Sequence, residues 1–414
     1  MDMQRKMTQE IRRHPFVALG LISVAELFTL SLWFSGSAIA HQLEQYWSLN
    51  PLMGGWITGA VQIGFVVGAL ISSFLSLADR YNPRKLFAAA AVLGAVVNVL
   101  IIVSHNAIFG LILRFLTGVM LAGVYPVAVK LVSLWFPKGR GVAIGILIAA
   151  LTMGSALPHL VVAILPEFPW RIIVIVNSIL ALIGAGIVYF GLPDARQDNG
   201  RIESLSLHVL GAVVRNRAVM LANYGYFGHM WELYAMWTWI PAFLGANLRA
   251  LHQTQSVVLT SVLSFVVIGV SGAVGSWFGG WFADRFGRTT STILSMAVSG
   301  SCALLIGLTY GRSYELMLLI AVVWGVFVIA DSAQFSAATT EVSDPDCVGT
   351  ALTFQMAIGF FITNLSINLI PVLESRIGWN WAFATLAVGP ALGIVAMARL
   401  RRHPDAVKIA NGKR

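Results

Sequence analysis

The chain has 414 residues, of which 57% are hydrophobic and only 11% are charged. Soluble domains carry roughly 25% charged residues, so this composition excludes an ordinary soluble enzyme and a disordered chain. Two cysteines are too few to stabilise a fold of this length, and the net charge of +9 is spread over short gaps between apolar runs. The composition therefore predicts a protein embedded in the lipid bilayer, with no nucleic-acid partner.

Apolar runs predict twelve membrane-spanning helices, because each is close to the ~20 residues that a helix needs to cross a bilayer. In chain order they cover residues 16–40, 54–78, 86–104, 107–134, 142–165, 171–192, 219–246, 256–283, 290–310, 314–337, 349–373 and 381–398. We predict an all-α protein with one six-helix bundle in residues 1–192, a cytoplasmic connector in residues 193–218, and a second bundle with a short tail in residues 219–414.

Basic residues predict how the chain is oriented. If the N-terminus is cytoplasmic, most Lys and Arg residues fall on the cytoplasmic side, as the positive-inside rule requires. Because the number of spans is even, the basic tail RLRRHPDAVK then returns to the same side. We therefore expect a multi-pass protein of the inner or plasma membrane with both termini in the cytoplasm.

Two internal matches indicate a repeat. The segments AELFTLSLW (25–33) and WELYAMWTW (231–239) align Glu26 with Glu232 and Trp33 with Trp239. The segments ADRYNPRK (78–85) and ADRFGR (283–288) align at nearly the same spacing. Such agreement predicts two related six-helix halves, which is the parallel repeat of a large class of transporters.

The stretch GGWFADRFGR, residues 279–288, resembles the signature loop between helices 2 and 3 of each half in the Major Facilitator Superfamily. Arg114, Gly118 and Gly123 in RFLTGVMLAG resemble the arginine-bearing helix 4 of that family. The resemblance implies a secondary transporter that alternates between two open states, and loops that latch its two halves together. The implied latch residues are Asp79, Arg80 and Arg84 in the first loop and Gly280, Asp284, Arg285 and Arg288 in the second, with Gly280 allowing close helix approach.

Charged groups inside the predicted spans are few, and a charge at the bilayer centre costs several kcal/mol unless it meets a cavity or a partner. Glu26, Arg114, Glu232 and Asp331 stand on helices 1, 4, 7 and 10, which line the central cavity in the family that the chain resembles. We expect the glutamates to exchange protons or bind substrate, or alternatively to form permanent ion pairs. Arg114 either binds an anionic substrate or balances Glu26, Asp331 either serves the site or anchors a loop, and His229 relays protons.

Aromatic and amide side chains predict the wall of a pocket. Residues seven positions apart lie on one helix face, which pairs each acidic residue of helices 1, 7 and 10 with a tryptophan. The expected pocket-lining residues are Trp33, Trp239, Trp324, Tyr125 and Asn364. The alternatives are that the tryptophans belong to interfacial aromatic belts and that the asparagine bridges two helices.

No enzyme motif is present in the sequence: we find no glycine-rich phosphate loop, metal-spaced cysteines or hydrolase elbow. We therefore expect no catalysis, cofactor or metal, and an ion gradient as the energy source. The expected function is proton-coupled symport of a small anionic metabolite by a monomer. The alternative is proton-driven efflux of drugs or metabolites, because three acids against one arginine favour a cation.

Overall fold

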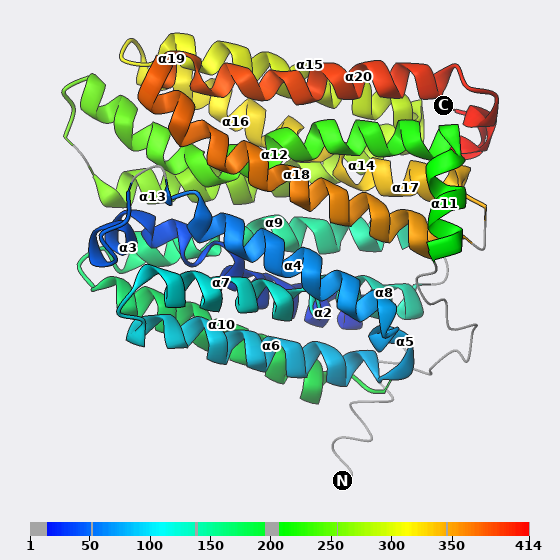
Figure 1. Cartoon of the computed structure of the whole chain (residues 1–414), viewed down its shortest axis with the longest axis horizontal. Coiled ribbons are helices and arrows are strands. Elements are labelled where there is room, and N and C mark those ends of the chain that lie inside the picture. The colour runs from blue at the N-terminus through cyan, green and yellow to red at the C-terminus, as the bar shows by residue number, and fades with distance from the viewer. Residues whose placement is uncertain are drawn as a thin grey trace.

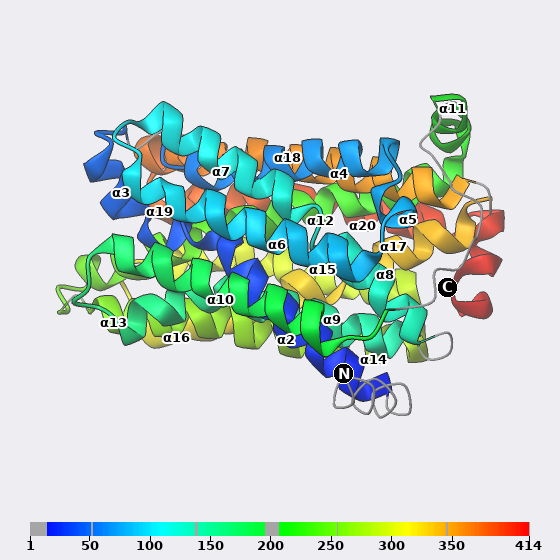
Figure 2. The same cartoon turned by 90° about the horizontal axis from the view of Figure 1, so that it is seen from below.

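The computed structural model describes residues 15–50, 53–136, 140–194, 207–254, 256–344 and 347–413. In these residues every regular element is a helix. Most helices run along the long axis of the molecule, with the N-terminal half below and the C-terminal half above (Figure 1). The view from below shows the same lengthwise arrangement (Figure 2).

The N-terminal half comprises helices from α2 to α10. Their bounds are α2 Pro15–Phe34, α3 Ala40–Tyr46, α4 Trp56–Phe74, α5 Leu77–Arg80, α6 Pro83–Val99, α7 Ala107–Leu121, α8 Tyr125–Trp135, α9 Arg140–Ile164 and α10 Trp170–Gly191. Two short 3-10 helices, η1 Ser37–Ile39 and η3 Leu100–Val103, extend the ends of longer helices.

The C-terminal half comprises helices from α11 to α20. Their bounds are α11 Leu207–Arg215, α12 Arg217–Ala250, α13 Val257–Phe265, α14 Ser271–Phe286, α15 Arg288–Ile306, α16 Tyr314–Ala330, α17 Ser332–Val342, α18 Val348–Ile377, α19 Trp379–Ala382 and α20 Val388–Arg401. The π-helical turn η4 Val266–Val270 joins α13 to α14, and the 3-10 helices are η5 Gly307–Thr309, η7 Phe383–Ala387 and η8 Pro404–Gly412.

The described residues contain eleven segments that are long and apolar enough to cross a membrane. The twelfth crossing helix is α12, whose 34 residues exceed the length that a bilayer requires. It falls below the hydropathy of the others because it carries polar residues such as Asn223, His229 and Glu232. The prediction of twelve membrane helices in two six-helix bundles is confirmed.

The repeat seen in the sequence is also visible in the helices. Each half breaks its fourth span: α7 gives way to α8 at residues 122–124, and α16 gives way to α17 at Asp331. The sequence spacing from α7 to α16 equals that from α8 to α17. The two fourth spans therefore bend at corresponding positions.

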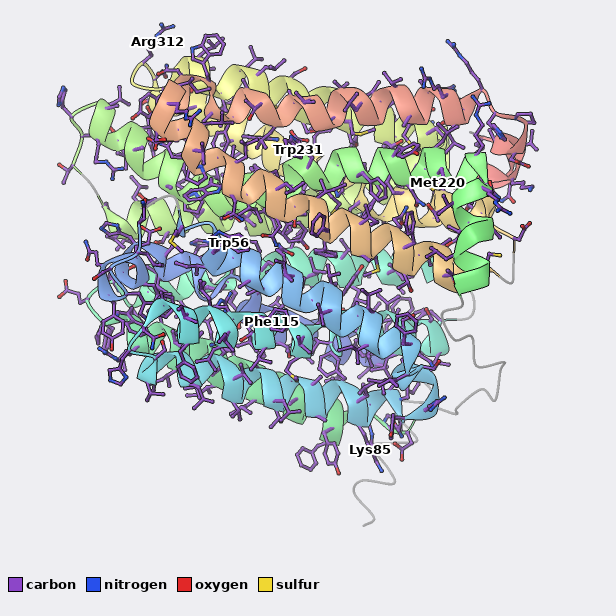
Figure 3. All side chains as sticks on the ribbon, in the orientation of Figure 1. Trp56, Lys85, Phe115, Met220, Trp231 and Arg312 are labelled. Atoms are coloured by element: carbon purple, nitrogen blue, oxygen red, sulfur yellow. The ribbon has the colours of Figure 1, made fainter. Side chains whose placement is uncertain are left out.

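The two ends of the molecule differ. We call the end where α10 stops and α12 begins the connector end; α11 lies across it in Figure 1. The opposite end, which carries α3 and α19, is the far end. Lys85 lies near the connector end and Arg312 at the far end (Figure 3). Residues 195–206 of the predicted connector lie outside the described residues, so its boundaries stay a prediction.

Close helix approach in the C-terminal half depends on Gly279 rather than Gly280. A Cβ atom added to Gly279 would overlap the carbonyl oxygen of Ala330 at the end of α16. A Cβ atom added to Gly280 would meet nothing within 4 Å. The expectation that Gly280 allows the approach is wrong, because one residue of shift turns a helix position by about 100°.

This pair of glycines provides a matched test of packing. Gly279→Ala is expected to lower the free energy of unfolding by about 3 kcal/mol, since overpacking against a backbone atom forces the helices apart. Gly280→Ala is expected to leave stability unchanged or raise it by up to about 1 kcal/mol through helix propensity. Thermal denaturation of both variants in detergent measures the difference; equal melting temperatures would contradict it.

Candidate functional site

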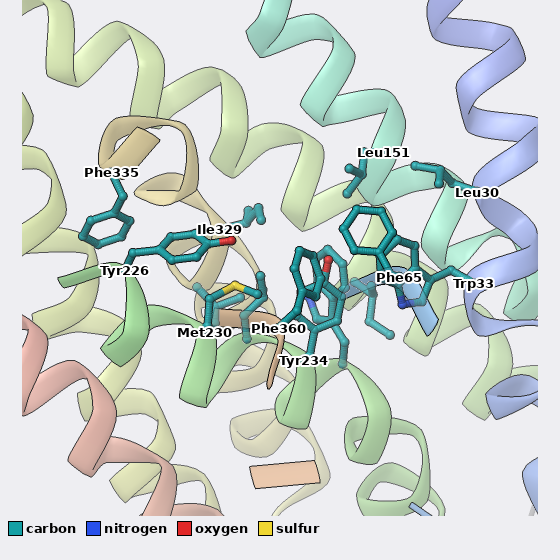
Figure 4. Close-up of a cluster of buried hydrophobic side chains, with 14 of the residues drawn as sticks. Leu30, Trp33, Phe65, Leu151, Tyr226, Met230, Tyr234, Ile329, Phe335 and Phe360 are labelled. Atoms are coloured by element: carbon teal, nitrogen blue, oxygen red, sulfur yellow. The ribbon is translucent and has the colours of Figure 1, made fainter. Parts of the chain in front are cut away.

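An aromatic cluster joins the two halves at the centre of the molecule. Trp33 of α2 stacks on Tyr234 of α12 with ring centroids 5.8 Å apart and an interplanar angle of 23°. Phe65 of α4 and Phe360 of α18 lie 4.9 and 5.7 Å from the Trp33 ring. Figure 4 shows these side chains converging from both halves. We call these four residues the aromatic cluster; their rings pack against one another and are almost completely buried in this structure.

Glu26 lies two turns from Trp33 along α2, on the same face as Leu30. Leu30 lies beside Leu151 of α9 in Figure 4, and Trp33 stacks on Tyr234 of α12, so the Trp33 end of this face looks toward the C-terminal half. The Glu26 carboxyl is fully buried, and neither of its oxygens has a hydrogen-bond partner among the described residues. It lies within electrostatic range of Tyr125, the first residue of α8.

Arg114 is fully buried inside the N-terminal half, where it joins α2, α4, α6 and α7. Its guanidinium donates to the carbonyl oxygens of Ile57 (3.2 Å), Leu32 (3.0 Å) and Trp33, and to Ser35 Oγ (3.1 Å) and Asn98 Oδ1 (3.3 Å). All five acceptors are neutral. Arg114 therefore makes no ion pair with Glu26 in this structure. The hydrogen bonds that it donates go to backbone and side-chain groups of the N-terminal half.

Glu232 is held inside the C-terminal half. Its Oε1 accepts a hydrogen bond from Trp324 Nε1 and its Oε2 accepts one from Ser299 Oγ, both at 2.8 Å. Trp324 is fully buried and packs edge-on against Phe383. The expectation that Glu232 and Trp324 line a cavity between the halves is therefore not met.

The reason is the orientation of α12. The face of α12 that meets the N-terminal half carries Tyr226, Met230 and Tyr234, spaced four residues apart (Figure 4). Glu232 lies between these positions on the opposite side of the helix. Sequence alignment pairs Glu26 with Glu232, but the two carboxyls face different surroundings.

His229 and Asp331 form a buried pair within the C-terminal half. His229 Nδ1 lies 2.9 Å from Asp331 Oδ1, and both side chains are almost completely buried. Asp331 lies at the junction of α16 and α17, inside a span that continues to Val342, so it is not at the end of its helix. The rings of Tyr226 and Phe335 pack against His229. The pair thus ties α12 to the bend in the tenth span.

Asn364 and Trp239 lie toward the far end. Asn364 Nδ2 donates to the Gly59 carbonyl oxygen of the other half at 2.8 Å, so this asparagine bridges helices. Trp239 Nε1 donates to the Ile367 carbonyl oxygen at 2.8 Å. A pocket of about 310 Å³ at the far end is lined by Glu44, Asn50, Trp239, Pro371, Glu374, Ser375 and Trp379. Burial raises the pKa of the Glu44 carboxyl more than His41 lowers it.

Comparison with known proteins identifies the family. The model of the Major Facilitator Superfamily matches residues 21–359 and 265–414 of the chain. The chain belongs to the Major Facilitator Superfamily. The broken fourth span of each half and the aromatic cluster between the halves therefore belong to a member of this superfamily.

Several characterised relatives are similar over much of the chain. The niacin transporter NiaP of Acinetobacter baylyi is 25% identical over 310 residues, which are 64% of this chain and 66% of that protein, just under two thirds of its length. The 4-hydroxybenzoate transporter PcaK of Pseudomonas aeruginosa is 24% identical over 411 residues, 89% of each chain. The gentisate transporter of Corynebacterium glutamicum is 24% identical over 385 residues, 88% of this chain and 83% of that one.

Solved structures of the superfamily share the fold. The proton:xylose symporter XylE, bound to 6-bromo-6-deoxy-D-glucose, superposes with a TM-score of 0.73 at 14% identity, covering 94% of this chain and 96% of its own. An inward-facing bacterial homologue of the lysosomal transporter Spinster gives a TM-score of 0.69 at 15% identity with the same coverage. At this level of identity the likeness concerns the fold alone.

The residues of the superfamily's signature loops make their described contacts within their own halves. Arg288 pairs with Glu341 at 2.7 Å, and Arg84 pairs with Asp194 at 2.8 Å. Arg285 lies over the Phe286 ring, the Asp284 carbonyl oxygen accepts from Lys413, and Arg80 is exposed. The side chain of Asp79 lies outside the described residues. A latch between the halves therefore stays a prediction.

Sequence reasoning missed five residues of the central region: Gln62, Phe65, Tyr226, Tyr234 and Phe360. The aromatic residues gave no signal, because phenylalanine and tyrosine are ordinary in apolar helices. Gln62 did give one, since it is the one carboxamide in the apolar run 54–78. A lone polar group in a membrane helix needs a partner or a ligand.

Proposed function

We propose that this superfamily member imports a small aromatic carboxylate together with protons across the inner or plasma membrane, as a monomer and without chemical change to the substrate. The observation that carries the proposal is Glu26, a buried carboxyl with no hydrogen-bond partner among the described residues, on the same face of α2 as Trp33 of the aromatic cluster.

The environment of Glu26 supports proton coupling. An ionised carboxylate that is buried without a partner is very costly in a medium of low dielectric constant, so the group is stable there as the neutral acid. When the halves separate and water enters, the charged form becomes stable and the carboxyl equilibrates with the water on that side. Glu26 therefore takes up a proton when the transporter opens to the more acidic outer side and releases it when the transporter opens to the less acidic cytoplasm, which moves one proton per cycle.

The aromatic cluster supports a ring-bearing substrate. Offset or tilted ring contacts contribute about 0.5–1.5 kcal/mol each beyond the burial of apolar area. Because Trp33 and Phe65 come from one half and Tyr234 and Phe360 from the other, a ring held among them contacts both halves. Such a substrate stabilises the closed state through which both bundles must pass.

The relatives support the same class of cargo. Several of the matching transporters are named for niacin, 4-hydroxybenzoate, gallate and gentisate, and one is named a probable sulfoacetate transporter. Each of the first four compounds is a single aromatic ring with one carboxyl group. We extend this substrate class to the present chain, with residues 1–192 and 219–414 as the two bundles that rock around the aromatic cluster.

The direction of transport follows from symport with protons, and the basic residues favour one orientation of the protein in the membrane. We place the connector end and both termini in the cytoplasm, as the positive-inside rule requires. The hydrogen bond from Asn364 to Gly59 then lies on the outer side of the aromatic cluster. A proton gradient directed inward would drive the carboxylate into the cell.

Uptake into proteoliposomes tests the proposal. With an inward proton gradient, labelled 4-hydroxybenzoate is expected to accumulate, and a protonophore is expected to abolish the accumulation. Excess gallate, gentisate or nicotinate should compete, whereas xylose should not. Competition by the lipophilic cation tetraphenylphosphonium, with no effect of the aromatic acids, would favour efflux of cations and refute import of carboxylates.

A further inference from the structure

Gln62 in α4 is completely buried, and neither atom of its carboxamide group has a hydrogen-bond partner among the described residues. The indole nitrogen of Trp33 is likewise buried without a partner. Burying an amide without a hydrogen bond is unfavourable, and such groups are rare in native proteins. Two such groups in one region favour a ligand that can hydrogen-bond to both of them.

The position of Gln62 on α4 shows where its side chain faces. Gly59, one turn before it, accepts a hydrogen bond from Asn364 of α18. Phe65, one turn after it, packs against Phe360 of α18 with ring centroids 4.7 Å apart. Because Gln62 lies between these two positions on the same side of the helix, it faces the interface between the halves.

Among the described residues, the other buried side-chain amides each make at least one hydrogen bond, for example Asn177 and Asn247, whereas Gln62 makes none. Gln355 in α18 donates to Asn223 Oδ1 at 2.9 Å and to Thr339 Oγ1 at 2.8 Å, and it accepts from Ser336 Oγ at 3.2 Å. Gln355 therefore fixes helices of the C-terminal half to one another. Gln62 has the same chemistry and the same burial but no such contacts.

We propose that Gln62, together with the indole N–H of Trp33, binds the polar ring group of the substrate while the carboxyl group of the substrate lies toward Glu26. The inference rests on the proposed function, because it assumes that an aromatic carboxylate occupies the interface. Gln62 then determines which aromatic acids are preferred.

The spacing of the polar groups fits one ring. Glu26 and Trp33 are separated by seven residues of α2, which is about 10 Å along the helix axis. A benzene or pyridine ring with polar groups at both ends fills this interval, with its flat faces against the aromatic cluster. A carboxamide both donates and accepts hydrogen bonds, so it suits a phenol hydroxyl or a ring nitrogen. The preferred class is therefore an aromatic carboxylate with such a group remote from the carboxyl.

Equilibrium binding to the purified full-length protein tests this inference with two ligands, 4-hydroxybenzoate and benzoate. The wild type is expected to bind 4-hydroxybenzoate about tenfold more tightly, the value of one well-made hydrogen bond. Gln62→Met keeps the size of the side chain and is expected to lose most of the preference for 4-hydroxybenzoate. Trp33→Phe, which keeps a ring but removes the N–H group, should reduce the preference in part.

Gln355→Met is the matched control. It is expected to lower the melting temperature, because it leaves Asn223 and Thr339 without their partner, yet to keep the preference for 4-hydroxybenzoate. Gln62→Met should keep or raise the melting temperature, since it removes an unsatisfied buried amide. If Gln62→Met keeps the full preference for 4-hydroxybenzoate, the inference is wrong but the proposed function stands. If the wild type binds neither acid, both the inference and the proposed function are wrong.

Discussion

Glu26→Gln is expected to abolish accumulation of the substrate against its gradient while leaving exchange of labelled for unlabelled substrate intact. The amide keeps the shape of the neutral acid but cannot release a proton, so the halves can still alternate without coupling. Each pH unit across the membrane is worth about 1.4 kcal/mol, which corresponds to tenfold accumulation for one proton. With a gradient of two pH units, the expected loss is therefore about a hundredfold, down to equal concentrations inside and outside.

Glu315→Gln is the control for this substitution, because Glu315 is exposed in the first turn of α16 at the far end. It should accumulate substrate like the wild type. If Glu26→Gln still accumulates substrate, another group couples transport to protons. The His229–Asp331 pair is then the next candidate, because among the described residues it is a buried acidic centre that lacks a full set of hydrogen bonds. Loss of exchange as well as accumulation would instead assign Glu26 to substrate binding.

The amino-acid sequence predicted the fold because the fold depends on quantities that sum over many residues. Apolar runs of about 20 residues located the spans, and even the polar helix α12 was recognised from its flanking hydrophobic residues. The repeat required only two short matches. Small errors in individual boundaries leave such inferences intact.

The candidate site depends on the direction in which single side chains point, and the sequence does not fix that direction. Glu26 and Glu232 occupy aligned segments, yet one faces the interface without a partner and the other is bonded to Ser299 and Trp324. The contrast between Gly279 and Gly280 has the same origin. Neighbouring positions differ by about 100° around a helix, so an uncertainty of one residue decides what a side chain meets.

Hydrogen-bond partners separate structural polar groups from functional ones more clearly than charge does. Arg114 and Glu232 are charged and buried, but the donors and acceptors around them are already paired within one half. Glu26 and Gln62 are buried, and neither side chain has a hydrogen-bond partner among the described residues. A buried polar group without a hydrogen-bond partner is unfavourable for folding. Binding of a substrate or a proton to that group explains why the protein keeps it.

Arg114→Met is expected to lower the free energy of unfolding by about 3–5 kcal/mol, the effect of removing one member of a buried polar network. Leu32 and Trp33 lie in the last turn of α2, where carbonyl oxygens lack partners within the helix, and Arg114 donates to both. A cation at a helix C-terminus also interacts favourably with the helix dipole. Thermal denaturation in detergent measures the loss, with Arg312→Met at the exposed far end as the control.

Arg114→Met and Arg114→Lys together distinguish the two roles that the sequence left open for Arg114. If the arginine caps α2, Arg114→Lys should be more stable than Arg114→Met, because an ammonium group still donates to the carbonyl oxygens. The folded fraction of Arg114→Met should then bind 4-hydroxybenzoate with nearly wild-type affinity. If the arginine binds the substrate anion, Arg114→Met should instead keep its melting temperature and lose binding by a factor of about a hundred or more, as truncation of a buried charge pair does. The five neutral acceptors that surround the guanidinium favour the first result.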